Sequence, residues 1–259
     1  DREHNVAPMI ISTGFLKYLR RGHLRQRALG LVVQPYRFAL VTGCPRSGTT
    51  AMVQWLGQQK RVSAVSETRI LVAVHEFLQA FDRLGHKSAK RRLIRTVLRT
   101  VSHHYATRIP IWGQLVVDKE PLEPIAFPDL SYKDFLEHVR LLIPETKLLL
   151  VIRHPVPTVW SMRNRPWRTE WLSLEECIRI WKDNAGIISS YTGHPNVYVC
   201  RFEDLVSQPE DVSHAILRFL GVRNGSIFVP KPTKEVALTH EEEAEIIAQT
   251  LDERAALGY

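Results

Sequence analysis

The stretch that decides the fold is Phe38-Ala39-Leu40-Val41-Thr42-Gly43-Cys44-Pro45-Arg46-Ser47-Gly48-Thr49-Thr50. Its apolar start is typical of a strand covered on both faces, and a helical pattern, Ala51–Leu56, follows the loop. Gly43 and Gly48 have the spacing of a phosphate-binding loop. Small residues let successive backbone N–H groups turn toward an anion, and the helix amino terminus adds partial positive charge. The stretch therefore predicts an anion site at the end of a buried strand, with a plain strand-to-helix turn as the alternative.

The loop departs from that of nucleotide triphosphatases at two points. Thr49 stands where those enzymes need a lysine, and the positive charge comes earlier, at Arg46. The apolar run 147–152 leads into Arg153, where a magnesium-binding carboxylate would be expected. These departures predict an anion site without a metal. A P-loop kinase with a degenerate phosphate loop stays open as an alternative.

Short aliphatic runs alternate with longer helical patterns along the chain. This alternation predicts one three-layer α/β domain over residues 1–259, P-loop-like, with a central parallel sheet flanked by helices. The predicted domain includes a basic helical extension at 1–36 and a Pro-rich loop at 222–238. Strands are expected at Phe38–Thr42, Val62–Val65, Leu115–Asp118, Lys147–Ile152 and Val197–Arg201. Further helices are expected at Leu71–Phe81, Lys90–His103, Tyr132–Ile143, Leu174–Ser190 and Val212–Leu220, and a last one from the capping box of Thr239 and Glu242 to about Leu257.

Composition narrows the class of protein. The 259 residues are 44% hydrophobic and 24% charged, which excludes a disordered chain, collagen and a coiled coil. The longest aliphatic run, Leu148–Ile152, is too short to span a bilayer, and no secretory signal opens the sequence. An anchor or domain upstream of Asp1 is left open. The three cysteines lack metal-ligand spacing, so we expect a reducing, cytoplasmic location and no metal site.

The positive charge of the chain favours an anionic partner. The sequence has 35 Lys and Arg against 27 Asp and Glu, a net charge of +8. Basic residues gather at 17–27 and 83–99, which we interpret first as solvated helix faces. The alternative is a docking surface for an acidic peptide, a carrier domain or anionic lipid. A non-catalytic module that binds nucleic acid is a third hypothesis, but the few aromatic residues near the basic runs argue against base stacking.

A second anion site is predicted at Arg153-His154-Pro155, where a buried strand ends. Pro155 suits the first turn of a helix, and Ser161 lies about two turns further on. An arginine and a serine hydroxyl together suit a phosphate monoester. The alternative is an arginine at the sheet edge and a serine bonded to its own helix. Two such sites at the carboxyl ends of parallel strands suit one ligand with two anionic groups.

Together these motifs resemble the sulfotransferases that use 3′-phosphoadenosine 5′-phosphosulfate (PAPS). The run 45–50 resembles their 5′-phosphosulfate loop, and 153–155 with Ser161 resembles their 3′-phosphate site. Two further landmarks support the resemblance: Arg201–Leu205, with Phe202 where Tyr is usual, and Leu257–Tyr259. The resemblance implies PAPS as donor, adenosine 3′,5′-bisphosphate as product and no metal. The donor-binding residues it implies are Pro45, Arg46, Ser47, Gly48, Thr49, Thr50, Arg153, Ser161 and, from the Pro-rich loop 222–238 closing over the nucleotide, Lys234 or else Lys231.

The catalytic candidates follow two predicted strands and so share one sheet edge. Glu67-Thr68-Arg69 and Lys119-Glu120-Pro121 resemble elements of the tyrosylprotein branch of this family. That resemblance implies Glu67 as general base, Lys119 and Arg46 as stabilisers of the leaving group, and Arg69 as the residue that orients Glu67 or the acceptor. A surface salt bridge of Lys119 to Glu120 or Glu123 is the alternative. Steroid- and phenol-type members use a histidine base, for which the candidates are His75 and His103.

The acceptor is expected to carry a hydroxyl group, on a small molecule, a carrier-bound intermediate or a peptide. Nucleic acid is not expected as a partner, and the sequence predicts no oligomeric state. Aromatic residues near the catalytic segments suggest an acceptor pocket, and the segment 163–168 suggests a lid. The pocket candidates are His75, Trp112, Trp160 and Trp167.

Overall fold

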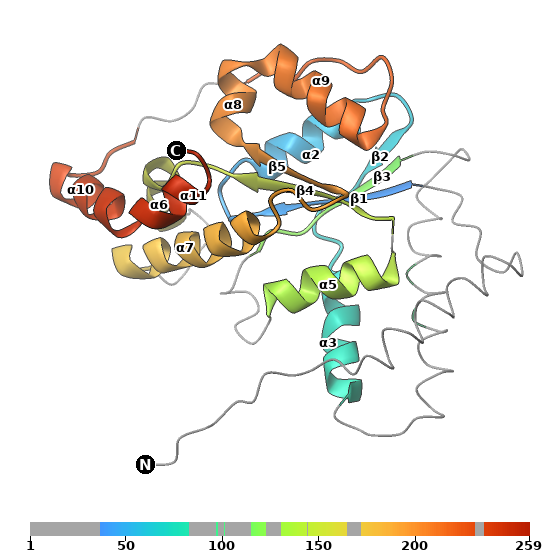
Figure 1. Cartoon of the computed structure of the whole chain (residues 1–259), viewed down its shortest axis with the longest axis horizontal. Helices are drawn as coiled ribbons and strands as arrows, with labels where there is room; N and C mark the ends of the chain where they lie inside the picture. Colours follow the sequence, from blue (N-terminus) through green and yellow to red (C-terminus); the bar gives the residue numbers. More distant parts are fainter. Residues whose placement is uncertain are drawn as a thin grey trace, which may run out of the picture.

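A five-stranded, all-parallel sheet forms the centre of the molecule (Figure 1). The computed structural model describes residues 37–82, 97, 101, 115–122, 131–143, 145–164, 172–230 and 236–259. The strand order is β2-β3-β1-β4-β5. Strand β1, which leads into the phosphate loop, therefore lies in the middle of the sheet. The bounds are β1 Arg37–Gly43, β2 Val62–Ala64, β3 Leu115–Lys119, β4 Lys147–Ile152 and β5 Val197–Arg201.

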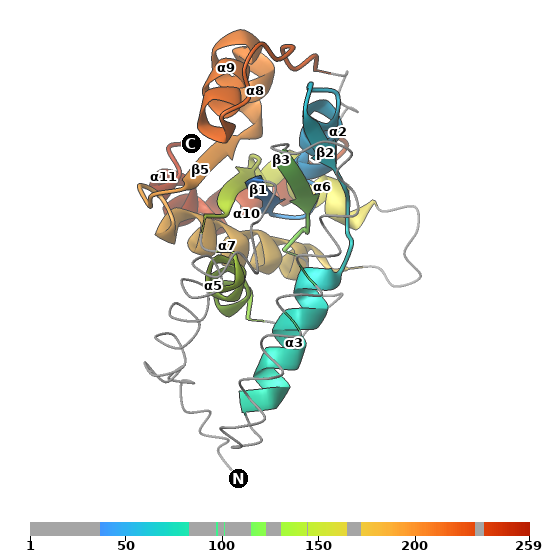
Figure 2. The same ribbon diagram turned by 90° about the vertical axis from the view of Figure 1, so that its right-hand side faces the viewer.

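Helices cover both faces of this sheet (Figures 1 and 2). Successive side chains of β4 point to opposite faces: Leu148 and Leu150 pack in the core beside α5 and α7, Leu149 in the core beside α2 and α9. Burial of each leucine stabilises the fold by about 1.5–3 kcal/mol. The predicted three-layer α/β fold is confirmed. The helices are α2 Thr49–Gly57, α3 Ile70–Asp82, α5 Tyr132–Leu142, α6 Pro155–Arg163, α7 Leu174–Ser190, α8 Phe202–Ser207, α9 Pro209–Leu220, α10 His240–Gln249 and α11 Leu251–Ala256.

The end of the chain corrects one sequence prediction. Instead of one last helix to about Leu257, two helices, α10 and α11, meet at Thr250. Thr250 has a non-helical backbone (φ −110°, ψ 15°), and its hydroxyl donates to the Ile246 carbonyl at 2.7 Å. The Ile246 carbonyl also accepts Thr250 N at 3.2 Å, so it is shared by two donors. Such back-bonding by a threonine hydroxyl bends a helix. The capping box of Thr239 and Glu242 forms as predicted.

Two other helix predictions were incomplete. Helix α8 follows β5 directly, where no helix was expected, and α9 begins at Pro209 rather than Val212. Proline suits the first helical turn because its missing N–H needs no partner there. Apart from Val97 and Val101, the expected helix Lys90–His103 lies outside the described residues, as do the extension 1–36 and residues 231–235 of the Pro-rich loop.

The structure also shows the state of the cysteines, and whether any described helix could cross a membrane or any described side chains could hold a metal ion. Cys44, Cys177 and Cys200 are buried and form no disulfide among the described residues. In the part of the chain that the structure describes, no helix has the length and apolarity needed to cross a bilayer. The described residues also contain no group of three His, Cys, Asp or Glu side chains arranged to hold a metal ion.

Candidate active site

The loop between β1 and α2 has the backbone geometry of an anion cradle. Gly48 has φ +93°, and a Cβ there would lie 2.4 Å from the Phe202 ring. At Gly43 a Cβ would lie 2.0 Å from the Val151 carbonyl oxygen, so both positions require glycine. Helix α2 starts without a side-chain cap, and Ser47 Oγ is buried without a hydrogen-bond partner among the described residues. An unsatisfied buried hydroxyl beside an uncapped helix start fits an anionic group.

A hydrogen bond joins the two predicted anion sites. Arg46 Nε donates to Ser161 Oγ at 2.9 Å, although the residues are 115 positions apart. Strands β1 and β4 are parallel neighbours, so the loops after them meet at the same sheet edge. Ser161 lies in α6, which begins at Pro155 as expected. The two loops therefore form one continuous site.

Arg153 stands at the end of β4 with its guanidinium 5.6 Å from the centroid of the Phe202 ring. Its carbonyl accepts a hydrogen bond from Trp181 Nε1 at 2.8 Å, which fixes the backbone. Burial lowers the pKa of Arg153, and the charge of Glu203 acts in the opposite direction. Among the described residues no carboxylate forms an ion pair with this guanidinium. Within the described part of the chain, the guanidinium of Arg153 is therefore not neutralised by an ion pair.

Glu67 and Lys119 meet at the same edge. Lys119 Nζ donates to Glu67 Oε1 and, at 3.2 Å, to Thr50 Oγ1 in the first turn of α2. The Lys119 side chain is 5% exposed and that of Glu67 is 41% exposed, so the carboxylate faces solvent over a buried cation. Burial raises the pKa of Glu67, but the hydrogen bond and charge of Lys119, with the charge of Arg69, outweigh it and lower the pKa. Glu67 is therefore ionised at neutral pH.

The loop that carries Glu67 has an unusual backbone. Glu67 (φ +53°) and Arg69 (φ +59°) both adopt the left-handed conformation, which is costly for residues with a side chain. Contacts with β3 hold the loop: Glu67 N donates to the Lys119 carbonyl at 2.8 Å, and Thr68 Oγ1 to Asp118 Oδ2 at 2.6 Å. Arg69 NH2 lies 3.5 Å from Glu67 Oε2. This geometry aims both side chains at the sheet edge.

Glu120 belongs to this network, although sequence reasoning gave it no place in the site. It is 1% exposed; its Oε1 accepts from Arg69 N at 2.6 Å, and its Oε2 lies 3.7 Å from Arg69 NH1. Burial raises the pKa of Glu120 to about 7; the charges of Asp118 and Glu67 act in the same direction, and Arg69 opposes them. Its position directly after Lys119, at the end of a buried strand, is the signal that could have found it. The salt bridge expected as an alternative, from Lys119 to Glu120, is absent among the described contacts, because Lys119 pairs with Glu67 instead.

Of the histidine and aromatic candidates, the structure describes His75 and Trp160. His75 is fully buried between α3 and α5, with its Nδ1 2.7 Å from His138 Nδ1, so it is a core residue and neither a base nor a pocket wall. Burial lowers its pKa to about 4, helped by His138. Trp160 is half-buried on α6. The other candidates lie outside the described residues: His103, Trp112, Trp167, Lys231, Lys234 and residues 165–168.

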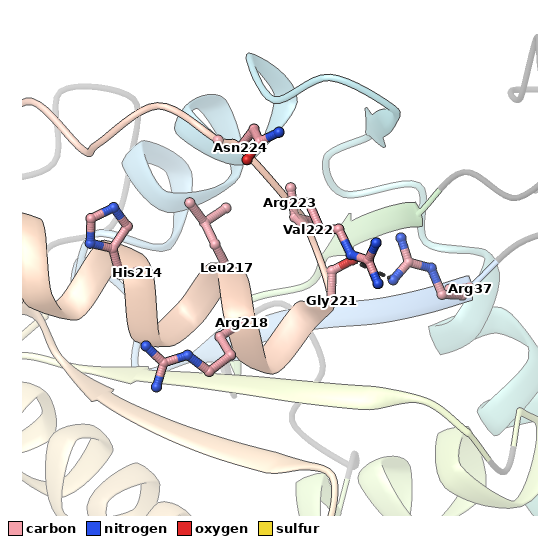
Figure 3. A pocket seen from close by; sticks show the side chains of 9 residues that line it. Arg37, His214, Leu217, Arg218, Gly221, Val222, Arg223 and Asn224 are labelled. Carbon is pink, nitrogen blue, oxygen red and sulfur yellow. Dashed lines mark hydrogen bonds between the residues drawn. The ribbon is translucent and has the colours of Figure 1, made fainter.

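A cavity of about 630 Å³ lies at the opposite, amino-terminal edge of the sheet, around the end of α9 (Figure 3). Three arginines and a histidine line it, but none of the predicted site residues does. Arg37 NH1 donates across it to the Gly221 carbonyl at 2.8 Å. The polar lining is Arg37, His214, Arg218, Arg223 and Asn224.

The loop sequence, the joined anion sites and the carboxylate–lysine pair define a class of protein. The model of the sulfotransferase family matches residues 39–224, and the chain belongs to this family. The predicted resemblance is thereby confirmed.

Two curated relatives of the chain are named as protein-tyrosine sulfotransferases. The chain is 28% identical over 188 residues to "Protein-tyrosine sulfotransferase 2" of Gallus gallus, covering 70% of this chain and 50% of that protein. It is 26% identical over 209 residues to "Protein-tyrosine sulfotransferase 1" of Danio rerio, covering 78% and 55%. The chain thus spans about half the length of these curated relatives. A solved sulfotransferase from Alicyclobacillus acidocaldarius shares the fold, with a TM-score of 0.55 at 19% identity over 85% of this chain and 93% of that one.

Proposed function

We propose that this chain transfers the sulfuryl group of PAPS to the hydroxyl group of an acceptor, with Glu67 as the general base. The observation that carries the proposal is the Arg46–Ser161 hydrogen bond, because it joins two anion loops into one site. A ligand with a 5′-phosphosulfate and a 3′-phosphate has the two anionic groups that such a site requires. The family to which the chain belongs supports the same chemistry.

For the donor, we assign the 5′-phosphosulfate to the loop 45–50 and the 3′-phosphate to Arg153 and Ser161, with Lys234 as a further candidate. Three features fit these groups: the Ser47 hydroxyl, which has no hydrogen-bond partner among the described residues, the uncapped start of α2 and the guanidinium of Arg153. When bound, PAPS supplies the activated sulfuryl group. No metal is invoked, since side-chain cations stand where the charge needs to be met.

For the chemistry, Glu67 accepts the proton of the acceptor hydroxyl while the hydroxyl oxygen bonds to sulfur. The bond from sulfur to the phosphate oxygen of the donor breaks on the opposite side, in line with the new bond. The lowered pKa of Glu67 keeps it ionised for this role. Lys119 and Arg46 stabilise the negative charge that develops on the leaving phosphate, since preorganised cations are most effective where charge appears. Arg69, 3.5 Å from Glu67 Oε2, orients the carboxylate.

For the acceptor, a tyrosine-bearing peptide is our first candidate, because both curated relatives carry "protein-tyrosine" in their names. A small-molecule or carrier-bound hydroxyl is the alternative. The three buried cysteines form no disulfide among the described residues, which supports a reducing, cytoplasmic location as a further part of this proposal.

The test is calorimetric titration of adenosine 3′,5′-bisphosphate into EDTA-treated protein, with ATP–Mg²⁺ as the comparison. We expect metal-independent binding of the bisphosphate, weakened at least about tenfold in Arg153→Ala, because a charged contact contributes about 1.5–3 kcal/mol. Ser161→Ala should weaken binding in the same direction. Arg218→Ala, at the opposite cavity, is the matched control and should bind normally. Preference for ATP–Mg²⁺ would favour the kinase hypothesis and contradict this proposal.

A further inference from the structure

Two sequence landmarks with no role in the proposed reaction meet beside Arg153. Arg201 pairs with Asp204, its Nε 2.7 Å from Oδ2, and its NH1 also donates to the Gly258 carbonyl. Its guanidinium lies 5.5 Å from the centroid of the Tyr259 ring. Gly258 has φ +76°, and a Cβ there would approach Arg201 NH1 to 3.2 Å. Arg201 therefore holds the turn that presents Tyr259.

Tyr259 and the backbone of His154 occupy both oxygens of Glu203. Tyr259 OH donates to Oε2 at 2.9 Å, and His154 N donates to Oε1 at 2.9 Å. The rings of His154 and Tyr259 pack edge to face, with centroids 5.5 Å apart. We call this arrangement of Glu203, Tyr259 and His154 the Glu203 clasp. Burial, with the charge of Glu203, raises the pKa of Tyr259, so the phenol stays protonated and can donate.

Glu203 is also the acid whose charge acts most strongly on Arg153. Each carboxylate oxygen can accept more than one hydrogen bond, so a carboxylate that reaches an arginine forms a charge-assisted pair with it. Yet no ion pair joins Arg153 to Glu203 in the described part of the chain, and the guanidinium lies over Phe202 instead. Pairing with Glu203 would compete directly with a phosphate for the same N–H groups.

We propose that the Glu203 clasp is a positioning device that holds this carboxylate away from Arg153 and so leaves the guanidinium available to the 3′-phosphate of the donor. The inference rests on the proposed function, because it concerns the same nucleotide site. Tyr259 and Glu203 act through Arg153 and are positioning residues, not catalytic ones. The two landmarks, Arg201–Leu205 and Leu257–Tyr259, thereby acquire a common purpose.

The test compares two nucleotides on the Tyr259→Phe variant by calorimetry. Loss of the phenol hydroxyl removes the bond that holds Glu203 Oε2 toward Tyr259, so the carboxylate can turn toward Arg153. We expect the dissociation constant of adenosine 3′,5′-bisphosphate to rise about tenfold, the size of one charge-assisted hydrogen bond. The dissociation constant of adenosine 5′-monophosphate, which lacks the 3′-phosphate, should stay within about twofold of the wild-type value, since Arg153 does not serve it.

A second variant separates competition from simple loss of structure. In Glu203→Gln/Tyr259→Phe the amide still accepts from His154 N but carries no charge to attract Arg153. We expect bisphosphate affinity to return to within about threefold of the wild-type value. The matched control is Tyr191→Phe, which removes a similar bond, from Tyr191 OH to Glu137 Oε1 at 2.8 Å, on α7 and α5, and should leave both affinities unchanged.

The outcomes separate this inference from the function on which it rests. Unchanged bisphosphate binding in Tyr259→Phe, equal losses for both nucleotides, or no recovery in the double variant would overturn the clasp while leaving the sulfotransferase proposal in place. Failure of the wild-type protein to bind the bisphosphate would overturn both together.

Discussion

The two edges of the parallel sheet use their cations in opposite ways. At the amino-terminal edge, Arg37 donates to the carbonyls of Leu220 and Gly221 at 3.1 and 2.8 Å, and Lys147 donates to that of Phe219 (Figure 3 shows Arg37). These carbonyls end α9, where the helix leaves acceptors unsatisfied and carries partial negative charge. Arg37 and Lys147 thus serve the fold by satisfying the carbonyls at the end of α9.

At the carboxyl-terminal edge, helices begin rather than end, and Arg153 forms no ion pair with a carboxylate among the described residues. Arg46 Nε donates to a hydroxyl, and Arg153 lies over an aromatic ring. Lys119 pairs with one carboxylate that is itself a catalytic candidate. In a parallel sheet with helical crossovers, helix starts gather at one edge and helix ends at the other. The carbonyl partners of Arg37 and Lys147 therefore indicate a structural role. The position of Arg153 is compatible with the proposed role in binding a ligand.

The largest effect that would test this comparison is at Glu67. In Glu67→Gln we expect sulfuryl transfer to fall by about 10²–10⁴-fold, the usual contribution of a general base, because the amide cannot accept the proton. Affinity for adenosine 3′,5′-bisphosphate should change by less than about threefold, since the anion loops are intact. Steady-state rates with PAPS and a tyrosine peptide, beside calorimetry, measure both quantities. A variant that keeps its rate would remove Glu67 as the base.

An intermediate effect concerns Glu120, the buried acid beside the proposed catalytic pair of Glu67 and Lys119. The pKa of Glu120 is raised from 4.5 to about 7. The folded state therefore binds the proton of this carboxyl more tightly than the unfolded state does. The stabilisation is full below pH 4.5 and is lost as the pH rises through about 7. Relative to Glu120→Gln, the wild-type free energy of unfolding should therefore decline by roughly 3 kcal/mol from pH 4.5 to pH 8. Urea denaturation of both proteins across this range measures the difference.

The comparison with the variant is needed because His75 titrates in the opposite sense. Its pKa is lowered to about 4, so its contribution is present above pH 6.5 and is lost as the pH falls through 4. This contribution is common to both proteins and cancels in their difference. A pH-independent difference between wild type and Glu120→Gln would argue that Glu120 is ionised in the fold throughout.

The smallest effect is expected at the amino-terminal edge. Arg37 is exposed, and Arg37→Ala should lower the free energy of unfolding by about 0.5–1 kcal/mol through the loss of its bonds to the end of α9. Nucleotide affinity and turnover should be unchanged, in contrast to Arg153→Ala. Denaturation and calorimetry on the same preparation test this contrast. Weakened nucleotide binding in Arg37→Ala would erase the distinction between the two edges.

The sequence predicted most of the described sheet and helix layers. The bounds of β4, β5 and α7 are as expected, because continuous apolar runs and the capping box of Ser173 and Glu176 mark them locally. The errors lie where the backbone conformation of a single residue divides an element, as at Thr250 between α10 and α11. Local patterns do not reveal whether a threonine caps a helix, bends it or points its hydroxyl into solvent.

By itself, the sequence determined the phosphate loop, the alternation of strands and helices, and the placement of Glu67, Lys119 and Arg153 after strands that share an edge. Only the tertiary structure decided which side chains meet. It paired Lys119 with Glu67 rather than Glu120, and joined Arg46 to Ser161. The physical reason is that the strand order β2-β3-β1-β4-β5 brings distant loops together. Hydrogen bonds and ion pairs depend on distances of a few ångströms, which no local pattern encodes.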